Sequence, residues 1–423
     1  MTHVLLFGNL RSSLTVARSL SRAGHVVHAG WDEPDPYLTA SRHVAHAFRH
    51  ALPDSEPEAA LRDLLAYLEA HPEIEALAPV SEIAARLVSR HRERFPAGVR
   101  LLLPEASVVE TCVDKAKMFD LCETLGVALA RREIVRDHAA LLAAVAAVGR
   151  PCVVKAVDSA HYLFGRKALI LHEGDDAAAL LPHWPAEHEA LCVQTFVDGP
   201  RHDISFAAYR GTLIGAVDCA VLRTDRADGT GYTTELVSAR AHPAVRHGLE
   251  ALVAALDYTG VGDIEFMVDE RSGLVSFVEL NPRLSASFKS AEVCGLPMSR
   301  LMLEIGLGGA PAPRADPWVH LVGRRIAWTK GELVGLKRDW RAGELSRGGL
   351  LRRAAVLLRA ALYPHHLTFD LGDPGPTLWL YLHPLLRRLG LRPRHERASA
   401  GPALEQLVGD GEGRRGLDLV PAG

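Results

Sequence analysis

Residues 261–287 read VGDIEFMVDERSGLVSFVELNPRLSAS and contain the pattern that decides the fold of this chain. Two apolar, extended segments flank the turn E-R-S-G at residues 270–273, which is typical of a β-hairpin. Each segment carries one carboxylate among apolar residues, Glu265 on the first and Glu279 on the second. Because an uncompensated carboxylate in such a strand pair is costly, these two glutamates indicate a functional site.

Asn281 and Arg283 continue the second segment of this hairpin. Since side chains alternate along a strand, Glu279, Asn281 and Arg283 are expected on one face. Carboxylate and amide oxygens suit Mg²⁺, and a guanidinium can clamp an anion through two hydrogen bonds. The pattern therefore predicts a site for Mg²⁺ with a polyphosphate, and the alternative is a hairpin with charged edges.

The composition indicates a soluble, cytoplasmic protein of two to four compact units in its 423 residues. A net charge of -3 gives no general attraction for polyanions, so we expect no nucleic-acid partner. The 6 cysteines form no C-x-x-C pair, which favours reduced thiols over disulfides or structural zinc. We find neither a signal-peptide pattern nor an apolar run of about 18 residues, so no membrane-spanning segment is expected.

Residues 1–105 alternate strand and helix patterns, which favours a parallel sheet flanked by helices. The turn after the first strand, GNLRSS, lacks the full G-x-G-x-x-G pattern and gives weak support for dinucleotide binding. Ser81 and Glu82 come just after a strand, at the edge where such sheets meet ligands. A local helix cap at Ser81 is an equally good interpretation.

Residues 106–185 predict one helix from Asp114 to Gly126 and a second between Asp137 and Gly149, followed by a strand–loop–strand unit. Lys115 opens the first helix, a position at which lysine is commonplace. Lys155 lies in the middle of the apolar strand at residues 152–156, where its charge needs an anionic partner. A lysine facing solvent is the alternative.

Residues 324–394 hold 14 Lys and Arg against 5 Asp and Glu, so the C-terminal part of the chain is basic. Two amphipathic helices are expected there, at Leu350–Leu362 and Leu378–Leu391. We favour their packing on the rest of the protein with arginines facing water. The alternative is peripheral contact with anionic lipid, with Trp379 and Tyr381 at the interface.

The chain resembles the ATP-grasp superfamily over roughly residues 1–310, through motifs that follow the family's order. These motifs are Lys115, Lys155, the segment LCVQTFV at Leu191–Val197, Glu265, and Glu-x-Asn-x-Arg at residues 279–283. The resemblance implies an α/β fold with an antiparallel catalytic sheet. Its expected parts are a Rossmann-like N-terminal domain at 1–105, a lid subdomain at 106–185, a catalytic subdomain at 186–310 and a basic, mostly helical extension at 311–423.

The resemblance also implies the cofactors ATP and Mg²⁺ (or Mn²⁺) and a set of site residues. Glu265, Glu279 and Asn281 would bind the metal, and Arg283 and Lys155 would act in catalysis. Contacts to ATP are implied for Lys115, Lys155, Gln194, Thr195, Phe196, Val197, Asp203, Gly165 and Arg166. The chain departs from the family's pattern at Arg201-His202, before Asp203, and in the lid loop DSAHYLFGRK, which has a single glycine.

The activity implied is that of an ADP-forming ligase, which converts a carboxylate to an acyl phosphate and joins it to an amine. The segment LSASFKSAE after Arg283 lacks the Gln-x-x-Glu-His pattern of biotin carboxylase and is more similar to stand-alone carboxylate–amine ligases. One alternative is a carboxylase or a carbamoyl-phosphate-like enzyme that uses bicarbonate. Another is a non-catalytic ATP-binding module with a membrane-surface tail. The expected partners are small carboxylate and amine substrates. The oligomeric state stays open, with a homodimer as one alternative because dimers are frequent in this superfamily.

Overall fold

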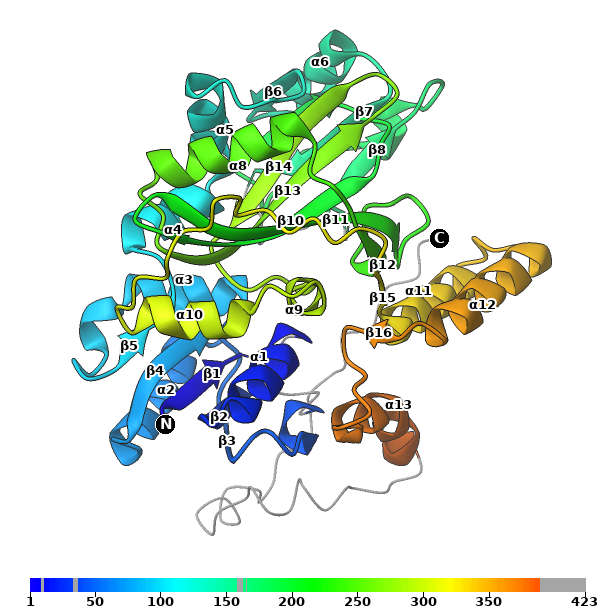
Figure 1. The fold of residues 1–423 in the computed structure, drawn as a ribbon. Coiled ribbons are helices and arrows are strands. Elements are labelled where there is room, and N and C mark those ends of the chain that lie inside the picture. The colour runs from blue at the N-terminus through cyan, green and yellow to red at the C-terminus, as the bar shows by residue number, and fades with distance from the viewer. Residues whose placement is uncertain (9–10, 33–36, 158–162, 165, 389–423) are drawn as a thin grey trace.

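The computed structural model describes residues 1–388 apart from residues 9–10, 33–36, 158–162 and 165. Within these residues the strands form three sheets, of five, four and seven strands. Figure 1 shows the five-stranded sheet and its helices at one end of the molecule and the two other sheets at the opposite end.

The N-terminal unit is the helix-flanked parallel sheet that the sequence predicts. Its elements are β1 (His3–Phe7), α1 (Arg11–Arg22), β2 (Val26–Trp31), η1 (Tyr37–Ala40), β3 (His46–Arg49), α2 (Pro57–Ala70), β4 (Ile74–Pro79), α3 (Glu82–Arg90), η2 (Arg92–Arg94) and β5 (Arg100–Leu101). The strand order is β3-β2-β1-β4-β5, and each neighbouring pair is parallel. Along β1, Val4 and Leu6 pack with α1, while Leu5 and Phe7 pack with α2 and α3, so helices cover both faces.

The second unit is built on an antiparallel sheet of order β6-β9-β7-β8. Its elements are α4 (Ala106–Val113), α5 (Lys115–Thr124), β6 (Arg132–Val135), α6 (His138–Val148), β7 (Cys152–Ala156), β8 (Leu169–Leu171), α7 (Ala177–Leu180) and β9 (Leu191–Thr195). Both predicted helices are confirmed, and an aspartate caps the start of each. Asp114 and Asp137 accept hydrogen bonds from the first free amide groups of α5 and α6.

The largest sheet has the order β14-β13-β10-β11-β12-β15-β16 and contains the predicted hairpin as β13 and β14. Its strands are β10 (Arg201–Tyr209), β11 (Thr212–Thr224), β12 (Thr233–Ser238), β13 (Gly260–Asp269), β14 (Leu274–Asn281), β15 (Arg325–Ala327) and β16 (His365–His366). The helices α8 (Pro243–Ala255), α9 (Lys289–Val293) and α10 (Met298–Gly306) accompany it. Leu6 of β1, Leu303 of α10 and Ile326 of β15 share one hydrophobic cluster, which joins this sheet to the N-terminal unit.

The C-terminal part is mostly helical, as expected, and it also supplies β15 and β16, which complete the large sheet. Strands of three and two residues are too short for side-chain alternation to reveal them in a sequence. The remaining elements are the helices α11 (Thr329–Arg341), α12 (Arg347–Ala361) and α13 (Gly375–Arg388). Figure 1 shows α11 and α12 side by side, projecting away from the sheet.

The aromatic residues of α13 make contacts within the protein. Leu380 belongs to the main hydrophobic cluster and Trp379 packs against it, while the Tyr381 and Thr329 hydroxyls are 2.7 Å apart. These contacts support packing of α13 on the protein over a lipid contact. None of the helices in the described part of the chain has the length and apolar character that crossing a bilayer requires.

Candidate active site

A cavity of about 580 Å³ is lined by residues from all three sheets or their flanking helices. The sequence-predicted residues that line it are Lys115, Lys155, Gln194, Phe196, Val197, Asp203, Glu265, Glu279, Asn281 and Arg283. Thr195 lies between Gln194 and Phe196 and is not among the lining residues, as alternation along an extended segment requires. Arg166 also lies outside the lining and pairs with Asp228 at 3.1 Å. Gly165 falls outside the described residues.

A row of three carboxylates crosses the floor of this cavity. Asp203 on β10 is the direct partner of Glu265 on β13, and Glu265 is the direct partner of Glu279 on β14. The Thr233 and Ser287 hydroxyls donate to Asp203 at 3.2 and 3.4 Å. Asp203 therefore lies beside the glutamate pair, and its predicted contact with the ribose of ATP stays a prediction.

Among the described residues, Lys115 and Arg201 form salt bridges with this row. The Lys115 ammonium lies 3.6 Å from Glu279, and the Arg201 guanidinium lies 2.9 Å from Asp203 and 3.5 Å from Glu265. Lys115 reaches the row because Asp114 caps α5 and fixes the lysine as the first residue of the helix. Arg201 lies two residues before Asp203, on the same face of β10. The chain departs from the family's pattern at this arginine, which contributes a cation to the carboxylate row.

The two glutamates nevertheless have very different proton affinities. Burial raises the pKa of Glu265 to about 7, since Arg201 does not outweigh desolvation and the nearby charge of Glu279. Burial also acts on Glu279, but Lys115 and Lys167 and the hydrogen bond from Asn281 lower its pKa to about 2. Arg201 therefore offsets the desolvation of Glu265 only in part.

The Glu-x-Asn-x-Arg residues are hydrogen-bonded in series. Asn281 donates to Glu279 at 3.1 Å, and Arg283 donates to the Asn281 side-chain oxygen at 3.0 Å. Arg283 also lies 3.7 Å from Glu82, which begins α3 in the N-terminal unit. Its Nε is buried and has no hydrogen-bond partner among the described residues, which leaves one donor of the guanidinium for a ligand.

Lys155 is a buried cation in the wall of the cavity. It is 7% exposed, and burial lowers its pKa. Its ammonium lies 5.7 Å from the centre of the Phe119 ring, and it forms no salt bridge with any described carboxylate. A buried ammonium without an anionic partner is costly, so Lys155 is suited to an anionic ligand in the cavity.

The N-terminal unit contributes side chains to the same cavity. Ser81 accepts a hydrogen bond from the Ala84 amide as the cap of α3, and Ser81 and Glu82 both line the cavity, so both interpretations of this turn apply. Arg11 on α1 also lines it, with its guanidinium 3.6 Å from the centre of the Trp328 ring. No sequence pattern predicts Arg11 at this cavity, because its position depends on contacts with residues more than 200 positions away.

The end of β9 and the segment that follows it form another wall of the cavity. Gln194 is buried, and Phe196, Val197 and Gly199 follow it along the lining. A Cβ at Gly199 would lie 2.0 Å from the Val268 carbonyl oxygen, so this close approach to β13 requires glycine. The wall combines apolar side chains with the side-chain amide of Gln194, which suits a planar base.

Comparisons with known proteins agree with this architecture. Residues 114–311 match the family model described as carbamoyl-phosphate synthase L chain, ATP binding domain. The chain is 28% identical over 162 residues to biotin carboxylase 2, chloroplastic, of Populus trichocarpa, a match that covers 34% of this chain and 29% of that protein. It is 36% identical over 163 residues to a formate-dependent phosphoribosylglycinamide formyltransferase of Stenotrophomonas maltophilia, covering 37% of this chain and 38% of that protein.

The matched segment thus spans about a third of the length of these curated relatives. Among solved structures, the L-amino acid ligase from Bacillus licheniformis is similar in fold, with a TM-score of 0.54 and 14% identity over 74% of this chain and 75% of that one. The family match, the shared fold and the glutamate pair facing a cation-lined cavity lead to one conclusion. Residues 114–311 of this chain form an ATP-grasp domain.

Proposed function

We propose that this protein is an ADP-forming ligase that activates a small carboxylate as an acyl phosphate and joins it to an amine. The observation that carries the proposal is the arrangement of charges around one cavity. Buried cations at Lys115 and Lys155 face a pair of opposed glutamates, and Arg283 adds a donor without a partner beside them. A polyphosphate and a carboxylate would satisfy these groups together.

ATP would lie between the segment after β9 and the glutamate pair. The Lys155 ammonium, which has no salt bridge within the described protein, would bind the phosphates, with Lys115 beside it. The base would lie against Phe196 and Val197, where Gln194 can hydrogen-bond its edge. The cavity's volume of about 580 Å³ lies in the range of cofactor and substrate sites.

The donor set at the hairpin fits Mg²⁺. Glu265, Glu279 and Asn281 offer hard oxygen ligands, and the raised pKa of Glu265 indicates that Arg201 alone does not offset the burial of this carboxylate. Bound there, Mg²⁺ would offset the negative charge of the β- and γ-phosphates during transfer. Lys115 would hold Glu279 ionised for this role.

The chemistry would proceed in two displacements. A carboxylate oxygen, held by Arg283, attacks the γ-phosphorus, so that a new P–O bond forms, the bond to the β-phosphate oxygen breaks and ADP leaves. The amine then attacks the acyl carbon, the C–O bond breaks, phosphate leaves and the amine loses a proton. No protein nucleophile takes part, so these side chains act by positioning and by charge.

The amine would enter next to Arg283, from the side of the N-terminal unit. Glu82 is paired with Arg283 and lines the cavity, so it offers an anionic group to an incoming ammonium. The pair between Glu82 and Arg283 would thus bring the amine and the carboxylate together. Sequence identity to a formate-dependent formyltransferase supports a carboxylate as the activated group.

A carboxylase that uses bicarbonate is the second candidate. Sequence identity to a chloroplast biotin carboxylase favours it. The segment after Arg283, LSASFKSAE, favours the ligase, because it lacks the Gln-x-x-Glu-His pattern expected of a site for bicarbonate and biotin.

A substrate screen tests the proposal. Full-length protein with Mg-ATP is offered pooled carboxylates, pooled amines, both pools together and bicarbonate alone, and the release of ADP and phosphate is measured. We expect release that needs both pools, a condensation product by mass spectrometry, and loss of both in Glu279→Gln. Release with bicarbonate alone would move the assignment to the carboxylase. Binding of ATP without turnover in any pool would contradict both enzymatic assignments.

A further inference from the structure

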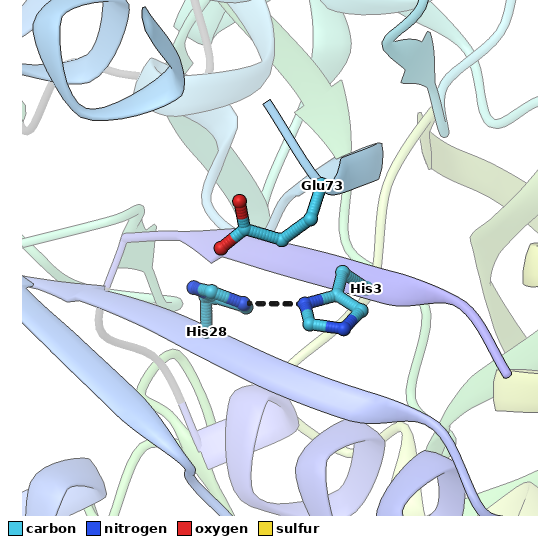
Figure 2. Close-up of side chains that lie close together, drawn as sticks. All are labelled: His3, His28 and Glu73. Atoms are coloured by element: carbon cyan, nitrogen blue, oxygen red, sulfur yellow. Dashed lines mark hydrogen bonds between the residues drawn. The ribbon is translucent and has the colours of Figure 1, made fainter. Parts of the chain in front are cut away.

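A cluster of histidines lies in the N-terminal unit, outside the cavity described above. Figure 2 shows His3 from β1, His28 from β2 and Glu73 from the turn before β4 converging on one point. The nearest nitrogen and oxygen atoms of these side chains all lie within 4.8 Å of one another. Their positions in the sequence follow no motif, so the cluster exists through the parallel pairing of β1 with β2 and β4.

The cluster and the active-site cavity lie at different edges of the same parallel sheet. His3 is the first residue of β1, and Glu73 directly precedes β4. Ser81 and Glu82, which line the cavity, follow the carboxyl end of β4. The proposed ligase chemistry therefore makes no use of these histidines.

The distance between the two imidazoles suits a shared cation. His3 Nδ1 and His28 Nε2 are 3.1 Å apart. Two nitrogens bound to one tetrahedral Zn²⁺, at about 2.0–2.1 Å each, are about 3.3 Å apart. Without a cation, one of these nitrogens must carry a proton and donate it to the other.

Neighbouring groups orient the rings as they do around protein-bound metals. The Tyr67 hydroxyl lies 3.0 Å from His28 Nδ1, so this nitrogen can donate its proton there and keep the Nε2 lone pair for a metal. His71 lies 2.9 Å from Glu73 and can hold that carboxylate in place.

We propose that His3, His28 and Glu73 form a binding site for a divalent transition metal of the Zn²⁺ class. Two imidazoles and one carboxylate are a ligand set that Zn²⁺ accepts and that Mg²⁺ disfavours. A fourth ligand would be water or a third histidine, since the His46 and His71 rings are centred 4.7 and 5.5 Å from the His28 ring. A bound ion would tie β1, β2 and the turn before β4 together and stabilise this edge of the sheet.

The test is zinc uptake by the full-length protein, purified without a polyhistidine tag. Equilibrium dialysis against Zn²⁺ in excess Mg²⁺ gives the stoichiometry and affinity, and thermal unfolding is followed in the same buffers. The variants are His3→Ala and Glu73→Gln, because these side chains are more exposed than His28 and less important for folding. The controls are His247→Ala, an exposed histidine on α8, and Glu75→Gln, an exposed residue close to Glu73.

We expect one tight equivalent of Zn²⁺ and a rise in melting temperature of a few degrees in the wild type and in both controls. His3→Ala and Glu73→Gln should each weaken zinc binding by about tenfold or more and lose the rise in melting temperature. Co²⁺ bound in place of Zn²⁺ should give visible absorption bands that both variants lack. Equal uptake by the wild type and His3→Ala, or no tight equivalent in the wild type, would overturn the proposal.

Discussion

Glu265 on β13 and Glu279 on β14 are directly opposite each other, yet the pKa of Glu265 is about 7 and that of Glu279 is about 2. The difference comes from their cations. Lys115 is 3.6 Å from Glu279, whereas Arg201 divides its charge between Glu265 and Asp203. One glutamate is therefore ionised at any physiological pH, and the other needs additional positive charge, which is the role proposed for Mg²⁺.

Glu279→Gln should lower turnover by about 100-fold or more, because it removes a charged oxygen ligand and leaves Lys115 without its partner. Steady-state ADP release at saturating Mg-ATP measures this loss. Glu270→Gln is the matched control, since Glu270 is exposed in the turn of the same hairpin. Comparable activity in wild type and Glu279→Gln would remove the hairpin from the mechanism.

Lys155→Met should weaken ATP binding by about 10- to 100-fold, the value of a charge-assisted hydrogen bond. The same change should raise the melting temperature of the ligand-free protein, because it removes a buried cation that has no salt bridge with the described residues. Calorimetric titration with ATP and thermal unfolding check the two effects. Lys337→Met, at an exposed position on α11, should change neither. Lower stability together with normal ATP binding would show that Lys155 has a structural role.

Asp373→Asn should lower the free energy of unfolding by about 3–5 kcal/mol, because it leaves Arg18 buried without its partner. The two side chains are 2.9 Å apart and 2–3% exposed, and they connect the C-terminal segment to α1. Asp370→Asn is the matched control, since its pair with Arg22 is partly exposed and should contribute about 0–1 kcal/mol. Urea unfolding of both variants measures the difference. Equal effects would mean that burial of the Arg18 pair does not determine its strength.

The buried pair of His202 and Asp218 should make stability depend on pH. The hydrogen bond and charge of Asp218, 2.8 Å away, outweigh burial and raise the pKa of His202 above 6.5. A group whose pKa is raised by folding stabilises the protein below its unfolded pKa, and this contribution is lost as pH rises through its folded pKa.

His202→Gln should therefore lower the melting temperature more at pH 6 than at pH 8.5. His247→Gln, at an exposed position on α8, serves as the control and should give the same small change at both pH values. A melting-temperature loss in His202→Gln that is independent of pH would show that His202 is neutral in the folded protein.

The hairpin could be predicted from sequence because its information is local. Glu265, the turn and Glu279 lie within one short stretch, and strand alternation alone places Asn281 and Arg283 with Glu279. The helix starts at Asp114 and Asp137 could be predicted for the same reason, since a cap depends on the next three residues.

The remaining parts of the site depend on which distant strands become neighbours. Asp203 joins the acidic row only because β10 pairs with β13 in one particular register, and a shift of one residue would turn it away. The contact between Glu82 and Arg283 joins two separate units of the chain. His3 and His28 likewise meet through strand pairing, so a sequence in which histidines are scattered gives no sign of their cluster.

Isotope labelling of the carboxylate oxygens tests whether this site activates a carboxylate as an acyl phosphate. Pooled carboxylates labelled with ¹⁸O are incubated with the protein, Mg-ATP and hydroxylamine, which replaces the unknown amine, and the released phosphate is examined by mass spectrometry. We expect a hydroxamate, ADP and phosphate that carries one ¹⁸O atom, all absent in Glu279→Gln. Phosphate without label, or label found in AMP, would contradict activation of a carboxylate as an acyl phosphate at this site.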